Sequence, residues 1–325
     1  MRKLTRLITA VAATAVMVVC GLCWYNSHEF LPREIHIAAG QKDGLYYELA
    51  QKLAQCLHKR TGRSVRVLET AGTEENVRHL RDGDAELALI QNVPHLRDGD
   101  AKLALIQAVS TTPEGLAGIA PLYPEILHLL ARKGKGIRSP KDLEGRRVAL
   151  GLRGSSMRQI SHTVLTHYQV KNVEDAEEYF GVLATEPGVD AALVTTGWMN
   201  PTVEKLLQRG DLELIGIDDP DGLAMRHPWF TTTTIPRGLY PAAPPAPPES
   251  VRTVAVTALL ACRADASDRL VREALAALYE SELRASFPAV LSARVAKDFD
   301  AAVMHPSVAM YHNPAAALNR LSGDH

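Results

Sequence analysis

The sequence is poor in the features by which proteins bind nucleic acid. Aromatic residues are only 5% of its 325 residues, too few to form a platform on which bases stack. The 36 Lys and Arg are balanced by 37 Asp and Glu, whereas a phosphate backbone is bound by a concentrated positive field. We therefore expect no nucleic acid among its partners.

The motifs of common catalytic and cofactor sites are also missing. The sequence contains no G-x-S-x-G, H-E-x-x-H, Walker A or G-x-G-x-x-G motif. Its 12 histidines lack the spacing of metal ligands, and His305 with His312 comes nearest to a pair near the end. These absences predict a protein that is not an enzyme and holds neither cofactor nor metal.

Cysteine is scarce, with four residues in the chain. Cys20 and Cys23 form a C-x-x-C, but both lie inside an apolar run, where they are interpreted as small hydrophobic residues. An exported domain permits Cys56 and Cys262 to form a disulfide. Because the sequence does not place these two within bonding distance, two buried thiols is the preferred interpretation.

The N-terminus has the pattern of a membrane anchor. Arg2, Lys3 and Arg6 precede an uncharged run of 18 residues, 7–24, which is at the threshold for spanning a bilayer. Basic residues before an apolar stretch keep the N-terminus in the cytoplasm and send the remainder across the membrane. We predict a cytoplasmic tip and retained anchor over residues 1–30 and a periplasmic or extracytoplasmic remainder; a cleaved signal peptide is the alternative.

Beyond residue 30 the hydrophobic pattern alternates between strands and helices. In the first half, strands at 35–40, 65–70 and 87–91 enclose two amphipathic helices that stop at Gly62 and Gly83, which predicts a doubly wound parallel sheet. A second α/β stretch has strands at 146–151, 189–197 and 212–217 and a helix at 155–167. Six prolines between Pro236 and Pro248 predict an extended surface connection before a long strand at 251–264. Two α/β lobes with a ligand cleft between them are expected.

Three of these strands end in small polar loops that open a helix directly. The loops have the sequences GQKDGLYY, AGTEEN and GLRGSSMRQ. Helix N-termini present free backbone N–H groups and a partial positive charge, which favour an anion. Together the three loops predict an anion-binding cleft.

The order of motifs resembles the TAXI-type substrate-binding proteins of tripartite ATP-independent periplasmic (TRAP) transporters. The matching stretches are AAGQKDGLYYELA, ETAGTEENVRHLRDGDAELALIQ, LYPEILHLLARKGKGIRSPKDLEGRRVALGLRGSS, VDAALVTTGWMNPTVEKL, IPRGLYP, VAVTALLACRAD and HPSVAMYH. The resemblance implies an α/β fold of the two-lobe periplasmic binding protein type (type II, venus-flytrap). It also implies one lobe from residues 31–124 with 252–325 and a second lobe from residues 125–251.

The same resemblance supplies candidate ligand-binding residues in the three loops and at two strand ends. They are Gly40, Gly44, Tyr46, Tyr47, Thr70, Gly72, Thr73, Asn76, Gln91, Gly154, Ser155, Ser156 and Trp198. The chain departs from the family where Asp43, Gly44 and Leu45 replace the usual Gly-Gly-Thr, and where Arg153 adds a cation beside the second-lobe loop.

Pattern and resemblance together predict a membrane-tethered receptor that binds a small anionic solute, an organic acid or amino acid, and delivers it to a TRAP permease. Closure of the two lobes on the solute would create the form that the permease recognises. The alternative is a sensory or scaffolding ectodomain that uses the same fold to signal to a membrane partner.

A tandem duplication interrupts the first lobe. Residues 76–91 and 92–107 agree at fourteen of sixteen positions, and differ only where Pro94 replaces Arg78 and Lys102 replaces Glu86. Two copies are too few for a solenoid, which needs at least about three repeats to bury a core. We expect the first copy to hold the sheet position, its Gln91 to reach the cleft in place of Gln107, and the second copy to form an extra excursion.

Overall fold

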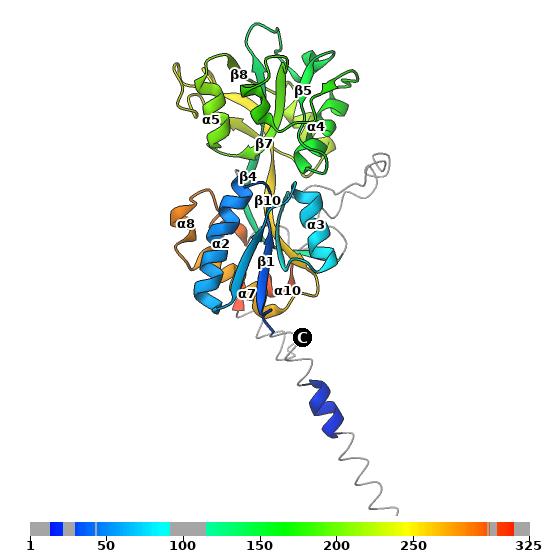
Figure 1. Ribbon diagram of the computed structural model, residues 1–325, viewed down its shortest axis with the longest axis vertical. Coiled ribbons are helices and arrows are strands. Elements are labelled where there is room, and N and C mark those ends of the chain that lie inside the picture. The colour runs from blue at the N-terminus through cyan, green and yellow to red at the C-terminus, as the bar shows by residue number, and fades with distance from the viewer. Residues whose placement is uncertain are drawn as a thin grey trace, which may run out of the picture.

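The computed structural model describes residues 14–21, 30–42, 44–91, 115–297, 299 and 304–314. Two α/β lobes stand one above the other in Figure 1 and share one sheet. The strand order is β2-β1-β3-β10-β4-β7-β5-β6, and β8 and β9 add to β4 and β10 respectively. The prediction of an α/β fold with two lobes is confirmed.

The first lobe is built by alternating strands and helices near the N-terminus and by helices near the C-terminus. Helices α2 and α3 end at Gly62 and Gly83, which adopt the left-handed conformation that favours glycine, as the sequence predicts. The elements are β1 (Glu34–Ala38), α2 (Leu45–Thr61), β2 (Ser64–Leu68), α3 (Thr73–Asp82), β3 (Leu87–Gln91), α7 (Asp268–Tyr279), α8 (Leu283–Ser286), α9 (Ala293–Ala296) and α10 (Pro306–His312).

Alternate residues of the first-lobe strands face opposite cores, as the pleat requires. Ile37 and Leu89 pack with α2 and α7 on one side, whereas Ala38 and Ile90 pack with α3 on the other. Figure 1 shows α2 and α3 on opposite sides of β1. Because both faces are covered, β3 is buried along its whole length.

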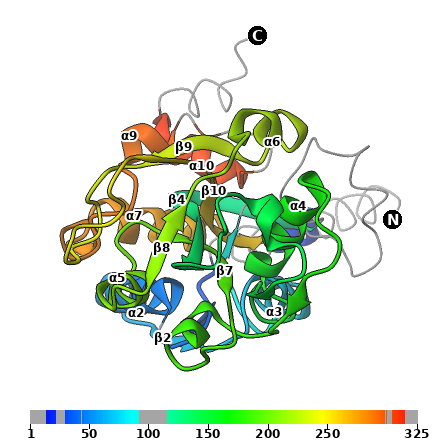
Figure 2. The same ribbon diagram turned by 90° about the horizontal axis from the view of Figure 1, so that it is seen from above.

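The second lobe repeats this arrangement with shorter elements. Helix α4 packs on one face of its strands, and α5 with η2 packs on the other; Figure 2 shows α4 and α5 on either side of β7 and β8. The elements are η1 (Pro140–Leu143), β5 (Arg147–Ala149), α4 (Ser156–His167), β6 (Glu174–Asp175), η2 (Phe180–Ala184), β7 (Ala191–Gly197), α5 (Pro201–Gln208), β8 (Leu212–Ile215), α6 (Pro220–Arg226) and β9 (Thr231–Ile235).

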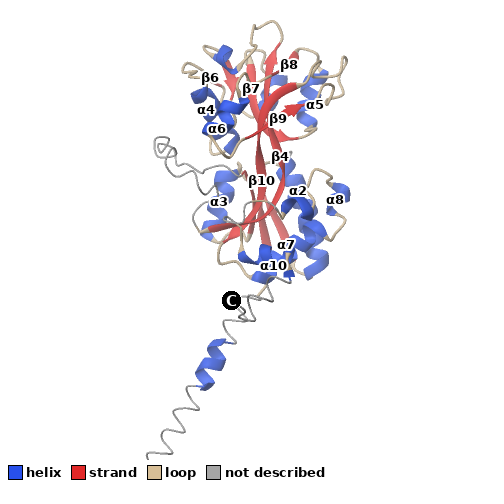
Figure 3. Cartoon of the chain, turned by 180° about the vertical axis from the view of Figure 1, so that it is seen from behind, coloured by secondary structure: helices blue, strands red, loops and turns tan. Residues whose placement is uncertain are grey.

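Two long antiparallel strands, β4 (Leu116–Arg132) and β10 (Val251–Arg263), run through both lobes (Figure 3). Val254 and Val256 of β10 pack in the second-lobe core, and Ala258 and Leu260 pack in the first-lobe core. The predicted lobe boundaries, 124/125 and 251/252, fall on these same two strands. We propose to place the boundary on β10 between Val256 and Ala258.

The hydrophobic pattern does not predict strand β4, because prolines interrupt its sequence. Pro121 stands opposite Leu259 and Pro124 opposite Thr257, and the register of the two strands shifts between Thr257 and Leu259. Proline has no N–H to donate to a ladder and is usually confined to edges and irregularities. In β4 the prolines lie where the ladder is already irregular, at the crossing between the lobes.

The three strands for which the sequence predicts a parallel sheet, β1, β2 and β3, are parallel, and the sheet as a whole is mixed. Strands β7 and β6 are also parallel to β5, but β10 is antiparallel to β3, β9 and β4. The first copy of the duplication supplies β3, as predicted. The second copy, with Gln107, lies outside the described residues.

The predicted N-terminal anchor lies only in part within the described residues. A helix covers residues 14–21. Among the described residues no helix has both the length and the apolar character needed to cross a bilayer. Cys20, Cys56 and Cys262 are free thiols. Cys262 is buried, as the preferred interpretation predicts, whereas Cys56 is only partly buried.

The proline-rich segment after β9 is anchored to the second-lobe core, more firmly than a surface connection requires. Tyr240 is fully buried, and its hydroxyl lies 2.6 Å from Nε2 of His128. Nδ1 of His128 lies 2.8 Å from the carbonyl oxygen of Ile126. Burial lowers the pKa of His128 to about 4, so the imidazole is neutral in the folded protein.

We predict that the buried His128–Tyr240 pair makes the protein sensitive to acid. Below pH 6.5 the unfolded chain protonates this histidine, whereas the folded protein does not until about pH 4. Stability is therefore lost as pH falls across this window, by up to about 3 kcal/mol. A His128→Leu, Tyr240→Phe double variant should show a flatter dependence of its urea-unfolding free energy on pH. Equal slopes for the two proteins would contradict this role.

Candidate functional site

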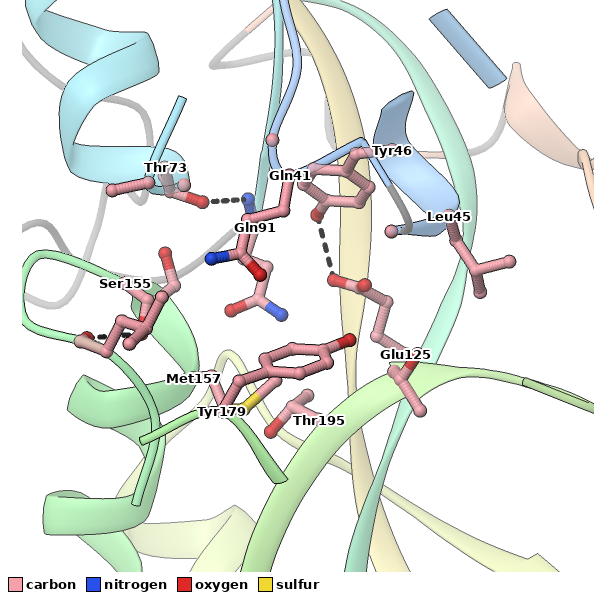
Figure 4. A pocket seen from close by; sticks show the side chains of 17 residues that line it. Gln41, Leu45, Tyr46, Thr73, Gln91, Glu125, Ser155, Met157, Tyr179 and Thr195 are labelled. Carbon is pink, nitrogen blue, oxygen red and sulfur yellow. Dashed lines mark hydrogen bonds between the residues drawn. The ribbon is translucent and has the colours of Figure 1, made fainter. Parts of the chain in front are cut away.

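An open cavity lies between the lobes and takes its walls from both; its empty space, with the solvent at its mouth included, is ≈ 690 Å³. Figure 4 shows side chains from α2, α3, β3 and β4 facing others from the loop before α4 and from β7. The lining residues are Gly40, Gln41, Gly44, Leu45, Tyr46, Ala71, Gly72, Thr73, Gln91, Glu125, Leu152, Ser155, Ser156, Met157, Tyr179, Thr195 and Thr196.

Most of the predicted site residues meet in this cavity. Those that line it are Gly40, Gly44, Tyr46, Gly72, Thr73, Gln91, Ser155 and Ser156. Those that do not are Tyr47, Thr70, Asn76, Gly154 and Trp198. Ligand contact stays a prediction for the first group, and the second group has other tasks in the fold.

Thr70 and Asn76 tie the first-lobe strands to α3. The hydroxyl of Thr70 donates to Oδ1 of Asn76, and Nδ2 of Asn76 donates to the carbonyl oxygens of Ala39 and Leu89. Because these bonds use the amide of Asn76 inside the protein, they hold the start of α3 beside the ends of β1 and β3. Tyr47 and Trp198 pack against the first-lobe and second-lobe cores respectively.

The start of α3 touches the second lobe. Gly72 has φ 135°, which only glycine adopts readily, and a Cβ on it would lie 3.5 Å from Cα of Ser155. The amide of Glu74 donates to the carbonyl oxygen of Gly154 at 3.3 Å. The glycines of the two loops therefore allow the lobes to meet beside the cavity.

The start of α4 offers two adjacent serines with different tasks. The hydroxyl of Ser155 donates to the carbonyl oxygen of Leu152 and accepts from the backbone amide of Arg158. Ser155 is thereby the N-cap of the helix. Ser156 is 4% exposed, and its hydroxyl has no hydrogen-bond partner in the described structure. Of the two, Ser156 is the one with unused hydrogen-bonding capacity.

Two further buried groups on the cavity wall lack partners. Oε1 of Gln91 and Oγ1 of Thr195 have none among the described residues, and both residues are at most 5% exposed. The backbone amide of Gln91 donates to Oγ1 of Thr73 at 3.2 Å, which fixes the end of β3 against α3 (Figure 4). An unsatisfied buried polar group costs about 1–3 kcal/mol, so its presence at a cavity indicates a binding surface.

Glu125 is a cavity residue that sequence reasoning missed. It lies on β4, is 5% exposed, and its Oε2 accepts a 2.8 Å hydrogen bond from the hydroxyl of Tyr46. Burial raises the pKa of Glu125 to about 7, against the opposing effect of hydrogen bonds from Tyr46 and Gln91. The signal was present, because Glu125 is the single charged residue between Leu116 and Ala131.

The two departures from the family pattern have different positions. Leu45 lines the cavity, so the wall there is apolar where a hydroxyl is usual. Arg153 is not among the lining residues, and it forms an ion pair with Glu177. Among the described lining residues there is no Lys or Arg, and the described residues contain no group of His, Cys, Asp and Glu suited to a metal.

Several solved structures are similar to this chain at low sequence identity. A protein of Bordetella bronchiseptica RB50 matches with a TM-score of 0.51 and 16% identity over 90% of this chain and 99% of that one. An ancestral arginine-binding protein bound to arginine matches with a TM-score of 0.49 and 12% identity over 80% and 96%. The alkanesulfonate-binding protein SsuA from Xanthomonas axonopodis pv. citri, bound to MOPS, gives 0.46 and 15% over 90% and 94%.

At 16% identity the Bordetella structure is evidence for the fold alone. Two α/β lobes with a cavity between them and two connecting strands make an α/β fold of the periplasmic binding protein type. The sequence itself matches the NMT1-like family over residues 37–312, which is most of the chain. The protein therefore belongs to the NMT1-like family.

Proposed function

We propose that the protein is a non-catalytic receptor that binds a small anionic solute in the inter-lobe cavity. The proposal is carried by three buried polar atoms that converge on one cavity and have no hydrogen-bond partner among the described residues: Oε1 of Gln91, Oγ of Ser156 and Oγ1 of Thr195. They come from both lobes. A solute that pairs with all three stabilises the arrangement in which the lobes are close.

The anionic character of the solute is supported by the helix starts at the cavity. Helix α3 has Gly72 as its N-cap without a side-chain cap, and its first turn carries Glu74 and Glu75. Helix α4 begins at Ser156 on the facing lobe and has no acidic residue in its first turn. Backbone N–H groups at helix N-termini carry a partial positive charge. The unpartnered hydroxyl of Ser156 beside them is a donor suited to a carboxylate.

Delivery to a membrane permease is the finer part of the proposal. The resemblance to TAXI-type proteins, from the first loop to HPSVAMYH, supports a TRAP permease as the partner. The basic and apolar pattern of residues 1–24 supports a tether to the cytoplasmic membrane with the lobes on the periplasmic or extracytoplasmic face. In this scheme the permease recognises the closed lobes.

The test is a thermal-shift panel of carboxylates, amino acids and sugars on residues 31–325. A solute that binds only the folded protein raises the melting temperature by mass action. Ser156→Ala should weaken the best solute about tenfold, the size expected for losing one hydrogen bond to a charged group. Ser161→Ala is the matched control, because Ser161 is buried on the same helix but donates to the carbonyl oxygen of Met157.

If no solute of the panel raises the melting temperature, the receptor hypothesis itself is contradicted. Equal losses of affinity in Ser156→Ala and Ser161→Ala would contradict only the assignment of Ser156 to the site.

A second prediction concerns lobe closure at Gly197. A Cβ on Gly197 would lie 3.0 Å from Cδ1 of Leu45 and 3.2 Å from Cε2 of Tyr123, both in the opposite lobe. Gly197→Ala should therefore oppose closure and weaken binding by roughly 1–3 kcal/mol, which is roughly 5- to 150-fold in dissociation constant.

Gly216→Ala is the control for this variant, because a Cβ there would meet its nearest atom at 3.5 Å, an ordinary contact. Affinities measured by titration calorimetry separate the two variants. Unchanged affinity in Gly197→Ala would show that the lobe contact does not contribute to binding.

A further inference from the structure

The two ends of the cavity differ in the charge that they favour. At one end lie the starts of α3 and α4 with Thr73 and Ser155; at the other lies Glu125 with Tyr46, and Gln91 stands between them (Figure 4). The first end favours a negative group. The second end presents a carboxyl, which repels one when it is ionised.

Glu125 is held in place by its neighbours and is therefore a fixed part of the wall. Tyr46 donates to its Oε2, and the side chain of Gln91 lies close enough to lower its pKa. Tyr123 lies two residues away on β4, with a buried hydroxyl that has no hydrogen-bond partner in the described structure. These contacts supply neutral donors, and none of them carries a positive charge.

A buried carboxylate without a cation is costly unless another group compensates it. The described lining residues include no Lys, Arg or His. The cavity opens directly onto Glu125, so the compensating charge has access from the solute side. A carboxyl-only solute has no group to offer there.

We propose that the solute is zwitterionic, an amino acid whose carboxylate lies at the starts of α3 and α4 and whose ammonium group lies against Glu125. The proposal rests on the proposed function, since it requires that a small solute occupies the cavity. It selects one of the two solute classes that the anion-binding prediction leaves open. Glu125 is then the specificity-determining residue, with Tyr46 as its positioning residue.

The pH dependence of binding follows from the same geometry. Burial raises the pKa of Glu125 to about 7, and an ammonium group binds its ionised form, so binding releases a proton and tightens as pH rises from 6 to 8. A solute with only carboxylates is repelled by the ionised form and weakens over the same range. The titratable groups facing Glu125 are Tyr46, Tyr123 and Tyr179; the pKa values of Tyr46 and Tyr123 are raised by burial, so they stay neutral here.

The experiment compares solutes that differ in one group. Titration calorimetry is run at pH 6, 7 and 8 with two series, L-alanine, L-lactate and propionate, and L-glutamate, L-2-hydroxyglutarate and glutarate. In at least one series the amino acid should bind roughly 10- to 100-fold more tightly than its two analogues, as expected for a hydrogen bond between charged groups. Its affinity should rise with pH.

Glu125→Gln keeps the shape of the side chain and removes its charge. This variant should no longer prefer the amino acid over the analogues that carry a hydroxyl group or a hydrogen in place of the ammonium group. Its affinity for the amino acid should no longer rise with pH. Tyr46→Phe is the second variant and removes a hydrogen bond that lowers the pKa of Glu125, so the rise in affinity should move to higher pH. Tyr47→Phe is its control, because Tyr47 does not line the cavity.

The outcomes separate this inference from the proposed function. If propionate or glutarate binds as tightly as the matched amino acid, the inference is overturned and the receptor stands. The same conclusion follows if the amino acid binds more tightly than its analogues but keeps that preference in Glu125→Gln. If none of the six solutes binds, both the inference and the anionic-solute receptor are contradicted.

Discussion

The antiparallel pairing of β4 with β10 is the constraint on which the rest of the structure depends. Each strand enters the core of both lobes, so the lobes cannot form as independent units with a flexible linker. The ladder is irregular where Pro121 and Pro124 lie, which leaves fewer hydrogen bonds at the crossing than on either side. The strands therefore connect the two lobes through a short segment in which their ladder is irregular.

The site inherits its character from this crossing. Glu125 lies on β4 at the point where the strand leaves the first lobe, so its carboxyl is buried by both lobes at once. The helix starts, by contrast, meet beside the cavity, where the two lobes touch through Gly72, Glu74 and Gly154. In the proposed function one wall takes the anionic group of the solute and the other takes a donor or cation. This division would select a solute by the arrangement of its groups as well as by its net charge.

The local elements of the fold were predictable because local interactions specify them. The apolar stripes of α2 and α3, their glycine stops, and the alternating strands β1 and β3 depend on neighbours a few residues apart. Strand β4 escaped the pattern because proline normally argues against a central strand, and only its partner β10 makes the interruption tolerable. The burial of Tyr240 in a proline-rich segment likewise depends on His128, which is 112 residues away in the sequence.

The sequence by itself determined the α/β class and the helix starts at the loops, because turns, caps and βα loops have short-range signatures. The small and polar residues of these loops became site candidates through the resemblance to TAXI-type proteins, and most of them line the cavity. Only the tertiary structure decided which hydroxyls are left without a partner, that Asn76 serves the fold, and that Glu125 joins Tyr46 and Gln91. These outcomes depend on the register of β10 against β3 and β4, and register is set by contacts between residues far apart in the chain.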